Sequence, residues 1–134
     1  MKVLQPPGWA APRGYANGIA ARGTLVLIGG QIGWNAQQQF ESDEFTAQAR
    51  QALRNVVEVL AQAGGRPEHI ARMTWYVVDR DEYVASYAAL GKAYREVIGR
   101  HFPAMTAVQV SALIEPRARV EIEATAVIPD APPR

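Results

Sequence analysis

The sequence contains no cysteine. This absence excludes disulfide frameworks, thiolate nucleophiles, and zinc or iron–sulfur sites with cysteine ligands. Histidine is almost as scarce, because only His69 and His101 are present and no carboxylates are spaced around them to complete a metal site. The sequence therefore argues against a metalloenzyme.

A strong charge of either sign is also lacking. Lys and Arg number 14 and Asp and Glu number 13, which gives a net charge of +1 and argues against nucleic acid as a partner. No apolar run approaches the roughly 18 residues of a membrane-spanning helix. Residues 1–14 contain several prolines but no apolar core of the kind found in signal peptides. We expect a cytoplasmic protein with no membrane partner.

The composition that is present is typical of a globular protein. The 134 residues are 49% hydrophobic and 20% charged, close to ordinary usage. A chain of this length usually builds one hydrophobic core. The sequence therefore predicts a single domain over residues 1–134.

Two helices are predicted from apolar residues that recur every three or four positions. The first covers residues 44–63, with Ser42 or Asp43 as its N-terminal cap and Gly64 and Gly65 as its stop. The second covers residues 81–99, with Gly91 as its weak point. Residues 67–69 are expected to form a single turn.

Strands are predicted where β-branched and aromatic residues are enriched. These segments are residues 24–29, 70–78, 105–111 and 119–128, and residues 18–22 are a candidate hairpin partner for residues 24–29. A tail follows from Asp130. The order of elements predicts an α+β fold, a mixed sheet with both helices packed on one face.

The last strand predicts which face the helices cover. Its two-residue period separates an apolar row from a second row made of Glu121, Glu123 and Thr125; the apolar row is Val120, Ile122, Ala124 and Ala126. The apolar row should face the helices. The opposite face is left uncovered, and its mixed character suggests a subunit interface.

Five segments appear in register over nearly the whole chain. They are PRGYANG at residues 12–18, GGQIG at 29–33, AQARQALRNV at 47–56, FPAM at 102–105 and VEIEATAV at 120–127. Together they resemble the Rid or YjgF-like family of reactive intermediate deaminases. The resemblance implies a chorismate-mutase-like fold assembled as a homotrimer, in which the uncovered sheet faces form a barrel and small-molecule pockets lie between subunits.

The resemblance also implies a site for hydrolysing an enamine or imine without a cofactor. Glu121 matches a glutamate that positions water or relays a proton, Tyr15 matches a tyrosine of the loop that covers the pocket, and Gly30 matches a position whose backbone touches the ligand. Further substrate-binding candidates are Gln31 and Ile32 in the GGQIG segment, and Ala107 two residues after FPAM.

Two positions depart from the pattern of the deaminating relatives. Met105 follows Pro103 and Ala104, where the family carries an arginine that clamps the substrate carboxylate, and Gly91 stands where we align an asparagine. A thioether offers no forked donors to a carboxylate, so 2-imino acids are doubtful substrates. The cations nearest in sequence, and therefore the candidates to replace the arginine, are Arg13, Arg117 and Arg119.

The sequence leaves alternatives open. Glu121 and Glu123 share a strand face, where they suit either paired-carboxylate chemistry or, more often, an ion-pair network with Arg119. For the whole protein, a deaminase competes with a non-catalytic trimer that binds a small metabolite for a regulatory purpose. Met105 favours the second hypothesis and Glu121 the first.

Overall fold

The structure of the protein is a computed structural model that describes residues 1–131. Six strands and three α-helices are found there, with one 3-10 turn at Pro67–His69. The strands are β1 (Lys2–Leu4), β2 (Gly18–Ala20), β3 (Thr24–Ile32), β4 (Ile70–Val77), β5 (Ala104–Gln109) and β6 (Val120–Ile128). The helices are α1 (Phe45–Ala61), α2 (Arg80–Ala85) and α3 (Tyr87–Val97). The tail predicted from Asp130 lies partly outside the described residues.

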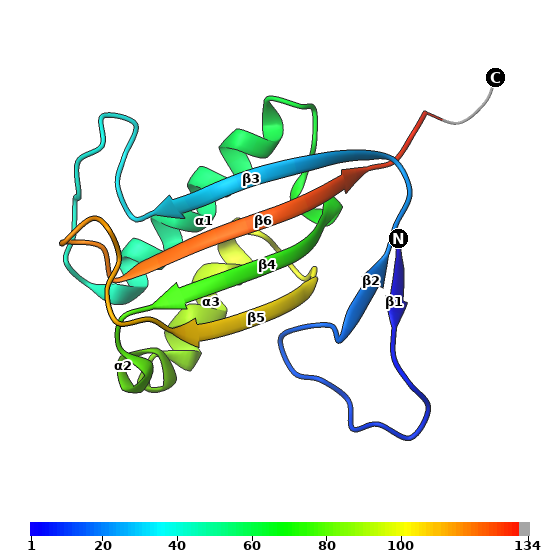
Figure 1. The fold of residues 1–134 in the computed structure, drawn as a ribbon, viewed down its shortest axis with the longest axis horizontal. Helices are drawn as coiled ribbons and strands as arrows, with labels where there is room; N and C mark the ends of the chain where they lie inside the picture. Colours follow the sequence, from blue (N-terminus) through cyan, green and yellow to red (C-terminus); the bar gives the residue numbers. More distant parts are fainter. Residues whose placement is uncertain (132–134) are drawn as a thin grey trace.

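Four strands form a mixed sheet in the order β3-β6-β4-β5. β6 is antiparallel to both of its neighbours, whereas β4 and β5 are parallel. The helices lie together behind the sheet in Figure 1, and the face toward the viewer is open. The predicted α+β fold with helices on one face is therefore confirmed.

The core lies between this sheet and the helices. The predicted apolar row of β6 is buried, with Val120, Ile122 and Ala126 at 0% exposure and Ala124 at 4%. Helix α1 contributes a matching stripe, Ala49, Ala52, Leu53, Val56 and Leu60, all at 0%. The two-residue and 3.6-residue periods read from the sequence thus identified both sides of the core.

Helix α1 ends as expected but begins differently. Gly64 adopts a φ of 80°, which favours glycine, and a Cβ at Gly65 would overlap with Leu60. At the other end the N-cap is Glu44, and no side chain caps the helix. Ser42 Oγ accepts only from the Glu44 N–H, at 3.0 Å, and Asp43 instead accepts from Arg117 at 2.8 Å.

The second predicted helix is two helices. The break falls at Ser86, whose φ of −99° and ψ of 6° end α2 and start α3, and not at Gly91. Asp79 caps α2 by accepting from the N–H groups of Asp81 and Glu82. The apolar residues Tyr83, Tyr87 and Leu90 keep steps of four and three residues across Ser86, so the repeat gave no sign of the break.

The predicted hairpin between residues 18–22 and 24–29 is wrong. β2 pairs with β1, a strand that sequence analysis did not identify, and β3 pairs with β6. The cause lies at Gly23, which has a φ of 144° and is so close to the Ile128 carbonyl that a Cβ would overlap with it. The chain therefore passes beside the end of β6 and does not turn back on itself.

Candidate functional site

The sheet is irregular where β3 crosses the middle of β6. Ile28 pairs with Ala124, but the register shifts before Gln31, which pairs with Ile122. The shift places Gly29 and Gly30 in a bulge inside the strand, so the strand predicted to end at Gly29 continues to Ile32. A Cβ at Gly30 would overlap with the Glu121 carboxylate, whereas a Cβ at Gly29 would meet nothing within 4 Å. Gly30 therefore makes the space that the Glu121 side chain occupies.

Glu121 lies on the open face of the sheet. It pairs with Ile32 on β3 and with Tyr76 on β4, and its two neighbours on β6 are buried in the core. Within residues 1–131 its carboxylate takes part in no ion pair and no side-chain hydrogen bond. We call Gly30, Gln31, Ile32 and Glu121 the glutamate cluster.

Glu123, two residues along the same face, is bound by a phenol and not by an arginine. Tyr76 donates its hydroxyl proton to Glu123 at 2.6 Å. This hydrogen bond to the carboxylate raises the pKa of Tyr76 above its ordinary value, because ionisation would place a phenolate beside an anion. The predicted network with Arg119 is wrong, since Arg119 makes a two-pronged contact with Glu82 of α2 at 2.8 Å.

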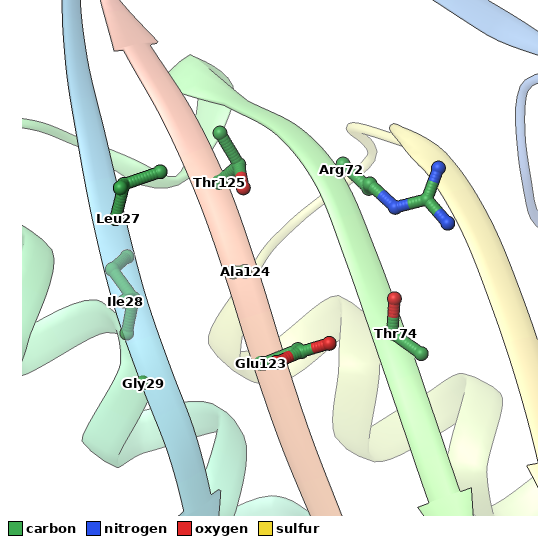
Figure 2. A pocket seen from close by; sticks show the side chains of 8 residues that line it. All are labelled: Leu27, Ile28, Gly29, Arg72, Thr74, Glu123, Ala124 and Thr125. Atoms are coloured by element: carbon green, nitrogen blue, oxygen red, sulfur yellow. The ribbon is translucent and has the colours of Figure 1, made fainter.

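A shallow hollow of about 320 Å³ extends along this open face. Figure 2 shows Arg72 and Thr74 on β4 beside Glu123 on β6, with Leu27 and Thr125 farther along. Leu27 is 73% exposed. The hollow combines apolar and charged groups, which is the mixed character predicted for the uncovered face.

The other candidates gather at the edge strand β5. Met105 is opposite Met73 and packs partly buried against the core, and Ala107 is opposite Trp75. Tyr15 is 43% exposed and is held beside the start of β5, because the next residue, Ala16, donates its N–H to Pro103 at 2.9 Å. We call Tyr15, Met105 and Ala107 the edge cluster.

The two clusters are separate within one chain. β4 lies between β6 and β5, and Glu121 points to the open face while Met105 points to the helix face. Gly91 belongs to neither cluster: it lies inside α3, and a Cβ there would meet only Arg95. Within one chain, the candidate residues therefore fall into two separate groups.

Two of the three arginines suggested as carboxylate clamps are occupied. Arg117 pairs with Asp43 at 2.8 Å and lies 5.2 Å from the centroid of the Phe40 ring, and Arg119 is held by Glu82. Arg13 is exposed. These arginines were chosen because they are near the candidate residues in sequence, and that nearness did not predict their ion-pair partners.

Sequence reasoning missed two features. Tyr76 was assigned only to a strand, because its contact with Glu123 depends on the register between β4 and β6, which no local pattern encodes. A pocket formed by the segment before β2 and the segment before β5 was also missed, with Trp9, Tyr15, Arg100 and Phe102 among its lining residues.

No group of three or more His, Asp or Glu side chains in residues 1–131 is arranged to hold a metal ion. Over the same residues, every helix is too short or too polar to cross a membrane. The fold and the candidate residues define an α+β protein that carries two carboxylates, Glu121 and Glu123, on an open sheet face.

The family model described as Endoribonuclease L-PSP matches residues 8–128. The chain belongs to this family, which includes the Rid and YjgF proteins. Human 2-iminobutanoate/2-iminopropanoate deaminase is 31% identical over 128 residues, which are 95% of this chain and 88% of that protein. Further homologues bearing the same name, from bacteria and ruminants, are 31% to 35% identical.

Solved structures share the fold. YyfB from Yersinia pestis, a Rid-family protein of unknown function, has a TM-score of 0.84 and 30% identity, covering 95% of this chain and 98% of that one. TdcF from Escherichia coli, solved with bound serine, has a TM-score of 0.68 and 28% identity, covering 96% and 100% of the two chains.

Proposed function

We propose that this protein hydrolyses a reactive enamine or imine at a site assembled between copies of the chain in a homotrimer, with Glu121 as the acid–base group. The observation that carries the proposal is the Glu121 carboxylate, which lies over Gly30 without a cationic partner among the described residues. A carboxylate that is not neutralised by a cation is free to accept and return a proton, as general acid–base catalysis requires.

The chemistry needs few groups. Water adds to the carbon of the C=N bond, the C–N bond then breaks, and the products are a carbonyl compound and ammonia. Glu121 takes a proton from the attacking water and returns a proton to the departing nitrogen. An enamine reaches the same step after a proton is added to its carbon. None of these steps calls for a metal or a redox cofactor.

Assembly between copies is supported by the separation of the two clusters. The glutamate cluster of one chain and the edge cluster of another supply the two sides of a pocket that neither chain completes alone. In this arrangement Tyr15 closes the site, the Gly30 backbone contacts the substrate, and Gln31, Ile32, Gly91 and Ala107 remain proposed contacts. Met105 takes the place of the carboxylate-clamping arginine.

A second function is favoured by Met105 itself. Its side chain packs against the core and offers no charge to an anion, which suits a non-catalytic protein that binds a metabolite between subunits. Turnover separates the two functions, because only the deaminase needs Glu121 to move protons.

The test is the Glu121→Gln variant assayed on imines that an amino-acid oxidase generates from a panel of amino acids. General acid–base catalysis typically contributes about 10²–10⁴-fold, so we expect turnover to fall by that factor. Light scattering on both proteins checks the assembly. The control is Glu115→Gln, which changes a carboxylate of the loop before β6.

Four outcomes are decisive. Loss of turnover with an intact trimer supports the deaminase. A variant as active as the natural protein contradicts the role of Glu121. Absence of turnover in the natural protein across the panel favours the binding protein, and a monomer in light scattering removes the shared site altogether.

A further inference from the structure

A second cavity lies beside the edge cluster. It has a volume of about 540 Å³, within the roughly 300–1,000 Å³ that small-molecule sites occupy. One wall is the segment between β1 and β2, and the other is the segment that leads into β5. We call it the N-terminal pocket; its main lining residues are Val3, Trp9, Tyr15, Arg100, His101 and Phe102.

Three aromatic rings give this pocket its apolar surface. Trp9 is 62% exposed, Tyr15 43% and Phe102 38%, high values for rings that usually bury most of their area. Aromatic side chains that converge on a cavity are typical of small-molecule sites. Their exposure indicates an apolar ligand body large enough to cover them.

Both walls are fixed by hydrogen bonds. Gln5 donates to the carbonyls of Trp9 and Ala10 at 3.3 and 3.2 Å and accepts from Asn17 at 2.8 Å, so the loop from 5 to 17 is tied across its middle. On the other wall, Tyr94 donates to the His101 carbonyl at 2.6 Å. A pocket organised before binding loses little entropy when a ligand enters.

The charges in the pocket are of one sign. Arg100 is exposed and takes part in no ion pair within residues 1–131, and none of the lining residues is an acid. His101 Nε2 faces the Ile70 carbonyl at 2.6 Å, and because a carbonyl only accepts, this nitrogen carries a proton. Arg13, by contrast, does not line the pocket.

We propose that the N-terminal pocket binds an organic acid with an aromatic body, which lies against Trp9, Tyr15 and Phe102 while Arg100 holds its carboxylate. The forked guanidinium can hold a carboxylate with two parallel hydrogen bonds. This proposal rests on the proposed function for turnover, because Tyr15 belongs to both sites. Arg100 then supplies the cation that position 105 lacks. The preferred substrates are imines derived from aromatic amino acids.

Binding is tested by calorimetry with three stable probes. They are 3-phenylpropanoate, its neutral amide 3-phenylpropanamide, and propanoate, which lacks the ring. We expect 3-phenylpropanoate to bind at least tenfold more tightly than either of the others. The amide lacks the charge that Arg100 binds, and propanoate lacks the ring that the aromatic side chains contact.

Arg100→Gln should weaken 3-phenylpropanoate about tenfold or more and leave the amide unchanged. Arg100→Lys should recover part of the loss, because lysine keeps the charge without the fork. The matched control is Arg54→Gln, which alters an exposed arginine of α1 outside the pocket and should leave all three affinities as they are. Equal affinity for acid and amide, or an Arg100→Gln protein that binds like the natural one, would overturn the proposal.

Turnover then distinguishes this inference from the proposed function. On imines from phenylalanine, Arg100→Gln should raise KM with little change in kcat, whereas Glu121→Gln should lower kcat. Turnover that needs Glu121 but not Arg100 refutes the pocket and keeps the deaminase. Binding that needs Arg100 without any turnover refutes the deaminase and keeps the pocket.

Discussion

The glutamate cluster and the edge cluster are built in opposite ways. The glutamate cluster lies on β6, which has a strand on each side and a buried row beneath it, so Glu121 is placed by a rigid frame. The edge cluster lies on β5, which is paired on one side only, and its Tyr15 comes from a loop outside the sheet. The comparison shows that the backbone of Glu121 is held by strands on both sides, whereas the edge cluster depends on one strand pairing and on the loop that carries Tyr15.

The largest loss of stability should come from truncating a core side chain beneath the glutamate cluster. Ile122 is fully buried under β6, and Ile122→Ala should cost about 2–5 kcal/mol of unfolding free energy. Val108→Ala on β5, where the side chain is 42% exposed, should cost less than about 1 kcal/mol. Urea denaturation compares the two, and equal costs would show that the edge is as rigid as the centre.

A smaller effect should follow from moving Glu121 without touching the core. Gly30→Ala introduces a methyl group where the carboxylate lies, and a shift of about 1 Å typically costs about 100-fold in rate. Gly29→Ala, in the same bulge, meets no atom within 4 Å and should keep its activity. Imine hydrolysis measures both. Similar losses in the two variants would assign the effect to the bulge and not to Glu121.

The edge should respond mildly to loss of one hydrogen bond. Tyr94 stacks on Phe102 with 5.5 Å between ring centroids and donates to the His101 carbonyl, and burial raises the pKa of Tyr94. Tyr94→Phe keeps the stacking and should cost about 1 kcal/mol. Calorimetric melting measures the loss of stability. We also expect the variant to bind 3-phenylpropanoate more weakly. A variant more stable than the natural protein would contradict the role of the hydrogen bond.

The smallest effect concerns protonation on the open face. The raised pKa of Tyr76 means that its bond to Glu123 stabilises the fold below pH ~10, the unfolded value, and that this contribution is lost as pH rises through the folded pKa. Absorbance titration of the natural protein and Tyr76→Phe isolates the transition. Glu123→Gln should lower the pKa of Tyr76 toward its ordinary value. An unchanged pKa in this variant would exclude Glu123 as the cause of the shift.

The sequence by itself determined which face of the sheet the helices cover, which side of the sheet each β6 residue faces, and the family. Alternation along β6 and the apolar stripe of α1 are local periodic signals, because burial repeats with the backbone geometry. The five motifs likewise pointed to Glu121, Tyr15 and Gly30 before any coordinates. Periodic patterns and motifs of this kind can be recognised in a single sequence, because each depends on residues that are close together along the chain.

Only the tertiary structure decided which residues meet. Strand register sets the contact of Tyr76 with Glu123. The partners of Arg117 and Arg119 depend instead on how the helices and the loop before β6 pack together. The same holds for Arg100 and Tyr15, which line one pocket because Ala16 joins the N-terminal segment to the start of β5 at Ala104. The physical reason is that hydrogen bonds and ion pairs depend on distances of a few ångströms, which packing of the whole chain fixes and no segment encodes alone.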